Sequence, residues 1–118
     1  MKMLALLLFF PLCVFAEEYS ARVVSVHDGD TIVILHQGRA ETVRLKGIDC
    51  SETSSRSRNY ASDALKGKNV KLKTYGKDKL KRTIADVFLE SGRLFNRDLV
   101  RTRHCRWKSQ QLVTESTE

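Results

Sequence analysis

The order of hydrophobic patterns along the chain constrains its fold more than any other feature. Residues 19–26, 31–35 and 41–45 are rich in valine and isoleucine and partly alternate with polar residues, as short β-strands do. The turn signal Asp28-Gly29 separates the first two segments, and a polar stretch separates the second from the third. We therefore expect a three-stranded meander.

A helical pattern follows this meander. Apolar residues recur at helical spacing over residues 53–66, with Ser and Thr as candidates for the N-cap and Gly67 as a C-terminal stop. Further strands are expected at 70–74 and 83–89, and a short second helix at 95–100. Five strands with a helix after the third predict a mainly β fold with helices (α+β), a small closed barrel, because closure removes exposed sheet edges.

The size of the chain limits it to one such unit. With 118 residues, of which 42% are hydrophobic, it can bury one small core but not two. We expect a single domain over residues 17–107 and a polar C-terminal tail over 108–118. A monomer is expected.

The first residues have the pattern of a signal peptide. Lys2 precedes an apolar run over residues 3–14, and Val14-Phe15-Ala16 suits cleavage before Glu17. The alternatives are an uncleaved anchor and a buried helix, but the run is shorter than the roughly 20 residues that cross a bilayer. We expect residues 1–16 to be removed and the protein to be secreted or periplasmic. Because bulky Leu12 precedes Cys13, no lipid anchor is predicted.

The net charge indicates the class of binding partner, and the cysteines bear on the redox state of the compartment. Cleavage would remove only Lys2 among the charged residues, lowering the formal net charge from +7 to +6. Such a surplus favours a polyanion such as nucleic acid, anionic lipid or an envelope polymer, although it also serves solubility. Cys50 and Cys105 would remain, and in an oxidising compartment they would form a disulfide or stay as two buried thiols.

Charged residues on the predicted loops offer a candidate site. Asp28, Asp30 and Asp49 are expected at one end of the barrel, where carboxylates suit Ca²⁺, although an Asp-Gly-Asp triplet is also a common turn. Arg44 lies between two core-facing residues of a strand, so its guanidinium would leave the outer wall and bind phosphate or a surface carboxylate. Glu52 follows on the next loop.

Two of these residues have alternative roles. Glu52 is placed to accept a proton from an attacking water, or simply to favour the dipole of the following helix. Arg82 ends the basic run 77–82 and begins a predicted strand, so it would face the pocket of Arg44 or belong to a solvated turn. Two arginines and a carboxylate are what phosphodiester hydrolysis requires.

The order of these motifs resembles the staphylococcal nuclease (thermonuclease) family. The matching segments cover most of residues 22–107 and are VHDGDTIVI, VRLKGIDCSE, RSRNYASDAL and KDKLKRTIADVFLESGRLFNRDLVR. The resemblance implies an OB-type barrel and a Ca²⁺-dependent phosphodiesterase that cuts DNA and RNA on the 5′ side of the phosphate, leaving 3′-phosphates with little sequence specificity. It implies that Arg44 and Arg82 bind phosphate and that Glu52 is the general base. It also implies three calcium ligands: Asp30, Asp49 and the backbone carbonyl of Cys50.

The chain also departs from the family pattern. Ser51 stands where proline is common, Leu80-Lys81 replaces Tyr-Gly before Arg82, and the residues after Trp107 lack tyrosines. The family's terminal helix is therefore expected to be missing, and Trp107 is expected in the core rather than as a stacking surface. A bridge between the two remaining cysteines would tie the active-site loop to the C-terminal segment.

Two other function classes compete with an enzyme. One is an OB-type module that binds nucleic acid without cleaving it, and the other is an exported structural protein that binds an anionic polymer. The binding module predicts loss of the catalytic residues, yet all of the implied site residues are present. A nuclease is therefore the favoured interpretation.

Overall fold

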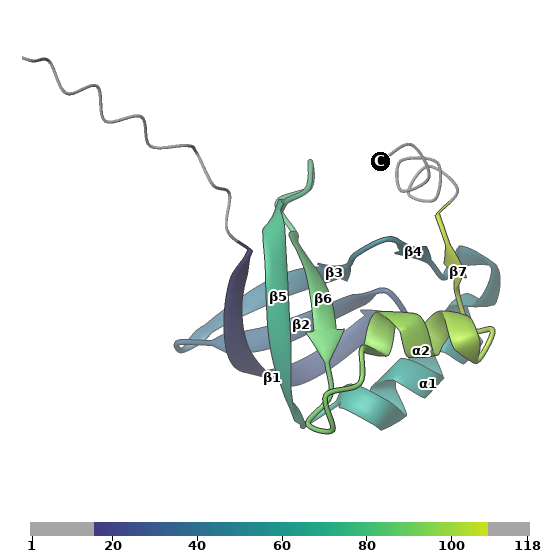
Figure 1. Ribbon diagram of the computed structural model, residues 1–118, viewed down its shortest axis with the longest axis horizontal. Helices are drawn as coiled ribbons and strands as arrows, with labels where there is room; N and C mark the ends of the chain where they lie inside the picture. Colours follow the sequence, from purple (N-terminus) through teal and green to yellow (C-terminus); the bar gives the residue numbers. More distant parts are fainter. Residues whose placement is uncertain (1–15, 109–118) are drawn as a thin grey trace, which may run out of the picture.

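Five strands close into a barrel in the computed structural model, which describes residues 16–108 (Figure 1). The predictions for residues 1–15 and 109–118 lie outside the described residues. Over residues 16–108, no helix is both long and apolar enough to cross a membrane. The elements in chain order are β1 (Glu17–Asp28), β2 (Thr31–His36), β3 (Arg39–Leu45), β4 (Ile48–Asp49), the 3-10 helix η1 (Ser51–Thr53), α1 (Ser54–Leu65), β5 (Asn69–Lys77), β6 (Thr83–Phe88), α2 (Phe95–Arg101) and β7 (Arg106–Trp107).

The barrel has the strand order β1-β2-β3-β6-β5 and closes where β1 pairs with β5. All of its strand pairs are antiparallel except β3 with β6, which run parallel. In that parallel pair Val43 is opposite Thr83 and Arg44 is opposite Ile84. The fold prediction is confirmed: the protein has a five-stranded OB-type barrel with one main and one short helix.

The main difference from the predicted elements lies outside the barrel. Strands β4 and β7 pair antiparallel as a separate two-stranded sheet, with Ile48 opposite Trp107 and Asp49 opposite Arg106. Two residues are too few to show a hydrophobic period, so the sequence pattern gives no sign of them. The helix predicted at 53–66 is present as α1 and ends before Gly67, whose φ of +79° suits a residue without a side chain.

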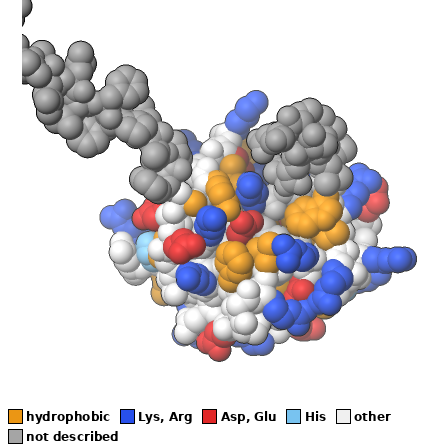
Figure 2. Space-filling model, viewed as in Figure 1, with side chains coloured by type: hydrophobic (Ala, Val, Ile, Leu, Met, Phe, Trp, Pro, Cys, Tyr) orange, Lys and Arg blue, Asp and Glu red, His pale blue; other side chains and the backbone are white. Residues whose placement is uncertain are grey.

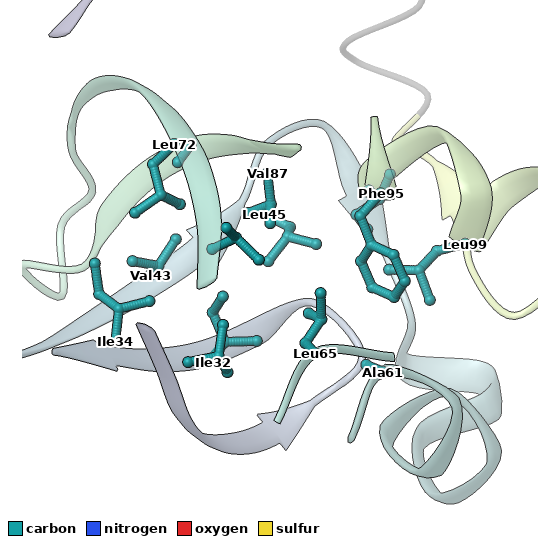
Figure 3. Packing of buried hydrophobic residues seen from close by; sticks show 14 of the residues in the cluster. Ile32, Ile34, Val43, Leu45, Ala61, Leu65, Leu72, Val87, Phe95 and Leu99 are labelled. Carbon is teal, nitrogen blue, oxygen red and sulfur yellow. The ribbon is translucent and has the colours of Figure 1, made fainter. Parts of the chain in front are cut away.

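The barrel is filled by aliphatic side chains from every strand, and the two helices close one end (Figures 1 and 3). On β3 the buried Val43 and Leu45 alternate with Arg44, which therefore leaves the opposite face. The other fully buried side chains that Figure 3 labels are Ile32, Ile34, Leu72 and Val87 in the barrel, and Ala61, Leu65, Phe95 and Leu99 from the helices.

One buried polar side chain fixes α2 against the barrel near the candidate site. Asn96 is 1% exposed, and its Oδ1 accepts a hydrogen bond from the backbone N–H of Val87 at 2.9 Å. Its Nδ2 donates to the carbonyl oxygens of Lys46 and Ala85. Since Lys46 directly follows β3, this amide joins α2, β6 and the end of β3, and a buried amide with all these partners is stabilising rather than costly.

Candidate active site

Arg44 leaves the barrel wall and anchors the segment that follows it. Its Nη1 donates to the carbonyl of Leu45 at 3.0 Å and its Nη2 to the carbonyl of Ile48 at 2.8 Å. Nη1 also lies 3.3 Å from Oδ2 of Asp30, and both side chains are only 13% exposed. The guanidinium therefore holds the chain that leads to Asp49, in addition to being a candidate phosphate ligand.

Arg82 is oriented by a turn built around Asp78. Its Nε donates to Oδ2 of Asp78 at 2.7 Å, while Oδ1 accepts hydrogen bonds from the backbone N–H groups of Leu80 and Arg82. Partial burial would raise the pKa of Asp78, but the bonds from Arg82 and Leu80 lower it below the ordinary value. Lys81 has a φ of +63°, so this turn keeps the left-handed backbone that glycine would favour.

The two arginines line one pocket of about 600 Å³, which we call the arginine pocket. Its lining also includes the end of β3 and the β5–β6 turn, and its remaining residues are Leu45, Lys46, Gly47, Tyr75, Asp78, Lys79, Leu80, Ile84 and Lys108. Strands β3 and β6 are neighbours, which is why Arg82, one residue before β6, lies near Arg44. The predicted pair of phosphate-binding residues thus shares one pocket.

Sequence reasoning did not single out Tyr75 or Lys46, which both line the arginine pocket. Tyr75 is 36% exposed, its hydroxyl donates to Asp86 at 2.8 Å, and Lys46 Nζ lies 4.2 Å from its ring centroid. Burial and the neighbouring Asp86 raise the pKa of Tyr75 to about 12. An aromatic ring beside cationic groups suits a nucleotide. The only sequence signal was the position of Tyr75, directly after a predicted strand.

Asp30 is brought against the loop after β4. Its Oδ2 accepts a hydrogen bond from the backbone N–H of Cys50 at 3.2 Å, across twenty residues of sequence. The neighbouring Gly29 permits this approach, because a Cβ there would lie 2.6 Å from Cβ of Ser57 and 3.2 Å from the sulfur of Cys50. Asp28, in contrast, is exposed at the end of β1.

Asp49 and Glu52 are held by a residue that sequence reasoning did not single out. Oδ1 of Asp49 accepts from the backbone N–H of Ser51 at 2.9 Å, and this bond, together with Arg106 and Arg44, lowers the pKa of Asp49. Arg106 Nη1 lies 3.1 Å from Oε1 of Glu52, and its Nη2 lies 3.8 Å from Oδ2 of Asp49. Glu52 lines a second pocket, separate from the arginine pocket.

A disulfide fixes this loop to the C-terminal segment. Cys50 and Cys105 are bonded, with their Cα atoms 4.3 Å apart, so of the two alternatives that the sequence left open the structure has the disulfide. The hydroxyl of Thr53 donates to the carbonyl of His104 beside it. Thr53 is the N-cap residue of α1, but its side chain makes no cap bond there because it serves this contact.

The predicted calcium ligands offer only oxygen atoms. Asp30 and Asp49 supply carboxylates, and the carbonyl of Cys50, which also accepts a hydrogen bond from Thr53 N–H, supplies a third oxygen. Over residues 16–108 there is no group of three or more His, Cys, Asp or Glu side chains placed to hold a metal. Since Ca²⁺ accepts carboxylate, carbonyl and water oxygens in irregular geometry, this donor set fits it, with water completing the coordination.

Comparison with known proteins matches the chain to one family. The model of the family described as "Staphylococcal nuclease homologue" matches residues 42–111. An "Uncharacterized endonuclease" of Haemophilus influenzae is 39% identical over 79 residues, which are 63% of this chain but only 44% of that protein. An "Uncharacterized endonuclease" of Escherichia coli O157:H7 is 30% identical over 119 residues, covering 97% of this chain and 77% of the relative.

Proposed function

Because the chain belongs to the staphylococcal nuclease homologues, we propose that it is a Ca²⁺-dependent nuclease that hydrolyses DNA or RNA. The observation that carries this proposal is the arginine pocket, where Arg44 and Arg82 lie together, with Asp30 held against Arg44 at its edge. Both similar endonucleases are named for cleavage of nucleic acid, and the net charge of +7 suits a polyanionic substrate.

Each residue has a distinct role in the proposed reaction. Arg44 and Arg82 bind the nonbridging oxygens of the scissile phosphate and stabilise the charge that grows on them in the transition state. Glu52 takes a proton from the attacking water. Asp30, Asp49 and the carbonyl of Cys50 would hold Ca²⁺, which supplies Lewis-acid neutralisation of a phosphate oxygen when bound.

Bond making and breaking follow from in-line attack. The water oxygen forms a bond to phosphorus, its proton goes to Glu52, and the bond from phosphorus to the 5′ oxygen breaks. The phosphate stays on the 3′ oxygen of the preceding nucleotide, and the released 5′ oxygen takes a proton from solvent. Little sequence specificity is expected, because these contacts go to phosphate and not to base edges.

We also propose that the protein works as an exported monomer. The signal-peptide pattern of residues 1–16 and the disulfide between Cys50 and Cys105 support an oxidising compartment outside the cytoplasm.

The second candidate function is a nucleic-acid-binding module without catalysis. The separation of Glu52 from the arginine pocket favours it, because the base must come within reach of the same phosphate.

The decisive experiment is cleavage of single-stranded DNA by the mature protein. We expect activity with Ca²⁺, none with a chelator, and a loss of about 10² to 10⁴-fold in kcat for Glu52→Gln, the size of a general-base contribution. Glu18→Gln, at an exposed residue of β1, is the matched control that removes an equal charge elsewhere. Unchanged cleavage by Glu52→Gln would overturn the general-base role of Glu52, and DNA binding without any Ca²⁺-dependent cleavage would overturn the nuclease proposal.

A further inference from the structure

A second pocket is lined by Asp49 and Glu52 and has different lining residues from the arginine pocket. It has a volume of about 470 Å³ and is formed where η1 and the end of α2 meet β7. We call it the tryptophan pocket, because Trp107 lines it together with Arg103, Arg106, Asp49 and Glu52. It therefore includes two of the candidate site residues, Asp49 and Glu52.

Trp107 offers an aromatic surface at this pocket. Its backbone pairs with Ile48, and its ring is half-buried, packing partly against the barrel core. Figure 2 shows hydrophobic surface at the place that β7 occupies in Figure 1, with Lys or Arg side chains beside it. A ring that is supported on the core side and open on the other can stack against a planar ligand at little cost in side-chain entropy.

The pocket is built before any ligand arrives. The Cys50–Cys105 disulfide and the hydrogen bond from Thr53 to His104 fix its base, and the His104 ring stacks on Tyr60 at a centroid distance of 4.1 Å. A fixed pocket avoids the ordering cost that a mobile one would impose on binding.

One cationic side chain at the pocket, Arg103, can bind an anionic group of a ligand. Arg106 pairs with both carboxylates, Asp49 and Glu52, so their charge is partly compensated. Arg103 is exposed and has no ion pair within residues 16–108. Its guanidinium is therefore available for a phosphate.

We propose that the tryptophan pocket binds an unpaired nucleobase of the substrate, stacked on Trp107, with the adjoining phosphate on Arg103. This inference rests on the proposed nuclease function. A nucleic-acid strand cut in its interior must continue on both sides of the scissile phosphate. If one side occupies the arginine pocket beside Tyr75, the other side passes Glu52 and reaches the tryptophan pocket. An aromatic ring next to an arginine is the arrangement that binds single-stranded nucleic acid.

The test uses the fact that Trp107 is the single tryptophan of the chain. Mature protein is titrated with a single-stranded oligothymidylate in the presence of a chelator, which prevents cleavage, and tryptophan fluorescence is followed. We expect a saturable change with the oligonucleotide and none with polyphosphate of matched charge. No change, or the same change with polyphosphate, overturns the proposal of a stacked base.

Variants test the same pocket independently of fluorescence. Trp107→Ala is expected to weaken oligonucleotide binding roughly 5- to 100-fold, the size of one lost stacking contact, while Trp107→Phe keeps most of the affinity. The Phe variant keeps an aromatic side chain packed against the core, so it is the control for loss of binding through misfolding. Tyr75→Ala, in the arginine pocket, is the matched control: it weakens binding but leaves the amplitude of the Trp107 fluorescence change intact. Equal affinity of the Ala variant and the wild type contradicts the proposal.

The result separates this inference from the proposed function. Ca²⁺-dependent cleavage with an unresponsive Trp107 overturns only the tryptophan pocket. An oligonucleotide-specific fluorescence change in a protein that never cleaves DNA supports the pocket and overturns the nuclease.

Discussion

The arginines and the carboxylates of the candidate site are held by different kinds of structure. Arg44 lies on a barrel strand and Arg82 borders another, so both are fixed by continuous strand pairing over a buried core. Asp49 and Glu52 lie outside the barrel, on a segment held by a two-residue strand pair, one disulfide and the ion pairs of Arg106. The half of the site that is proposed to bind phosphate thus has far more structural support than the half that is proposed to activate water.

Only a few bonds join the two regions. Arg44 donates to the carbonyl of Ile48, and Asp30 accepts from the N–H of Cys50. Local stability tends to be lowest where few contacts hold a segment. We therefore expect perturbations of the loop to reduce activity before they unfold the barrel.

The largest expected effect comes from removing the disulfide. Replacing Cys50 and Cys105 by serine should lower the free energy of unfolding by about 4 kcal/mol, because the bridge closes a loop with a sequence separation of 55. Leu72→Ala, in the barrel, is the matched perturbation and should cost about 2–5 kcal/mol. Urea unfolding measures both changes.

Measuring kcat at a temperature where both variants are folded tests whether the loop and the barrel differ in their effect on activity. The cysteine variant should lose kcat because Asp49 and Glu52 are released, whereas the folded Leu72→Ala protein should keep it. If both variants keep full kcat, the loop does not depend on its disulfide and the comparison fails.

The next effect distinguishes the two arginines. Arg82→Gln and Arg44→Gln should each lower kcat about 10²- to 10³-fold, as loss of a preorganised transition-state donor does. Arg44→Gln should also lower the free energy of unfolding by about 1–3 kcal/mol, because the carbonyls of Leu45 and Ile48 lose a partner. Arg82, bonded to Asp78 in a partly exposed turn, should leave stability almost unchanged. Equal stability of the two variants would show that Arg44 does not anchor the β4 segment.

The smallest expected effect tests how the ion pair with Arg106 positions Glu52 on the loop. Arg106→Gln removes the ion pair to Glu52, so the Glu52 carboxylate can occupy more rotamers. We expect kcat at saturating substrate to fall about tenfold, which corresponds to about 1.4 kcal/mol in activation free energy. Stability should change by less than about 1 kcal/mol, because both partners are largely exposed. Arg97→Gln, on the exposed face of α2, controls for the loss of one positive charge. A raised kcat would mean that Arg106 withholds Glu52 from water.

Much of the fold was predictable because it depends on local patterns. The alternation in β3 placed Val43 and Leu45 inside and Arg44 outside, and the structure has this arrangement. The glycine after α1 marked its end for a similarly local reason, its positive φ. The barrel prediction followed from the number and order of these elements.

The candidate site was less predictable, because its contacts cross long stretches of sequence. Arg106 was not singled out, since nothing in a basic C-terminal segment shows that it pairs with Glu52, and Tyr75 gave no signal beyond its place after a strand. Trp107 was expected in the core, yet it packs there only in part and also lines a pocket. No residue in this group has a local periodicity that reveals its partner.

The sequence by itself determined the strands, the helices, the closed barrel and the set of charged residues from which a site can be built. Hydrophobic period and turn residues act over a few positions, so they can be seen without knowing the fold. Only the tertiary structure decided which charges share a pocket, that Arg106 rather than Arg44 contacts Glu52, and that β4 is held by β7 and a disulfide. These depend on distances between segments that are far apart in the sequence, which closure of the barrel and packing of α2 set together.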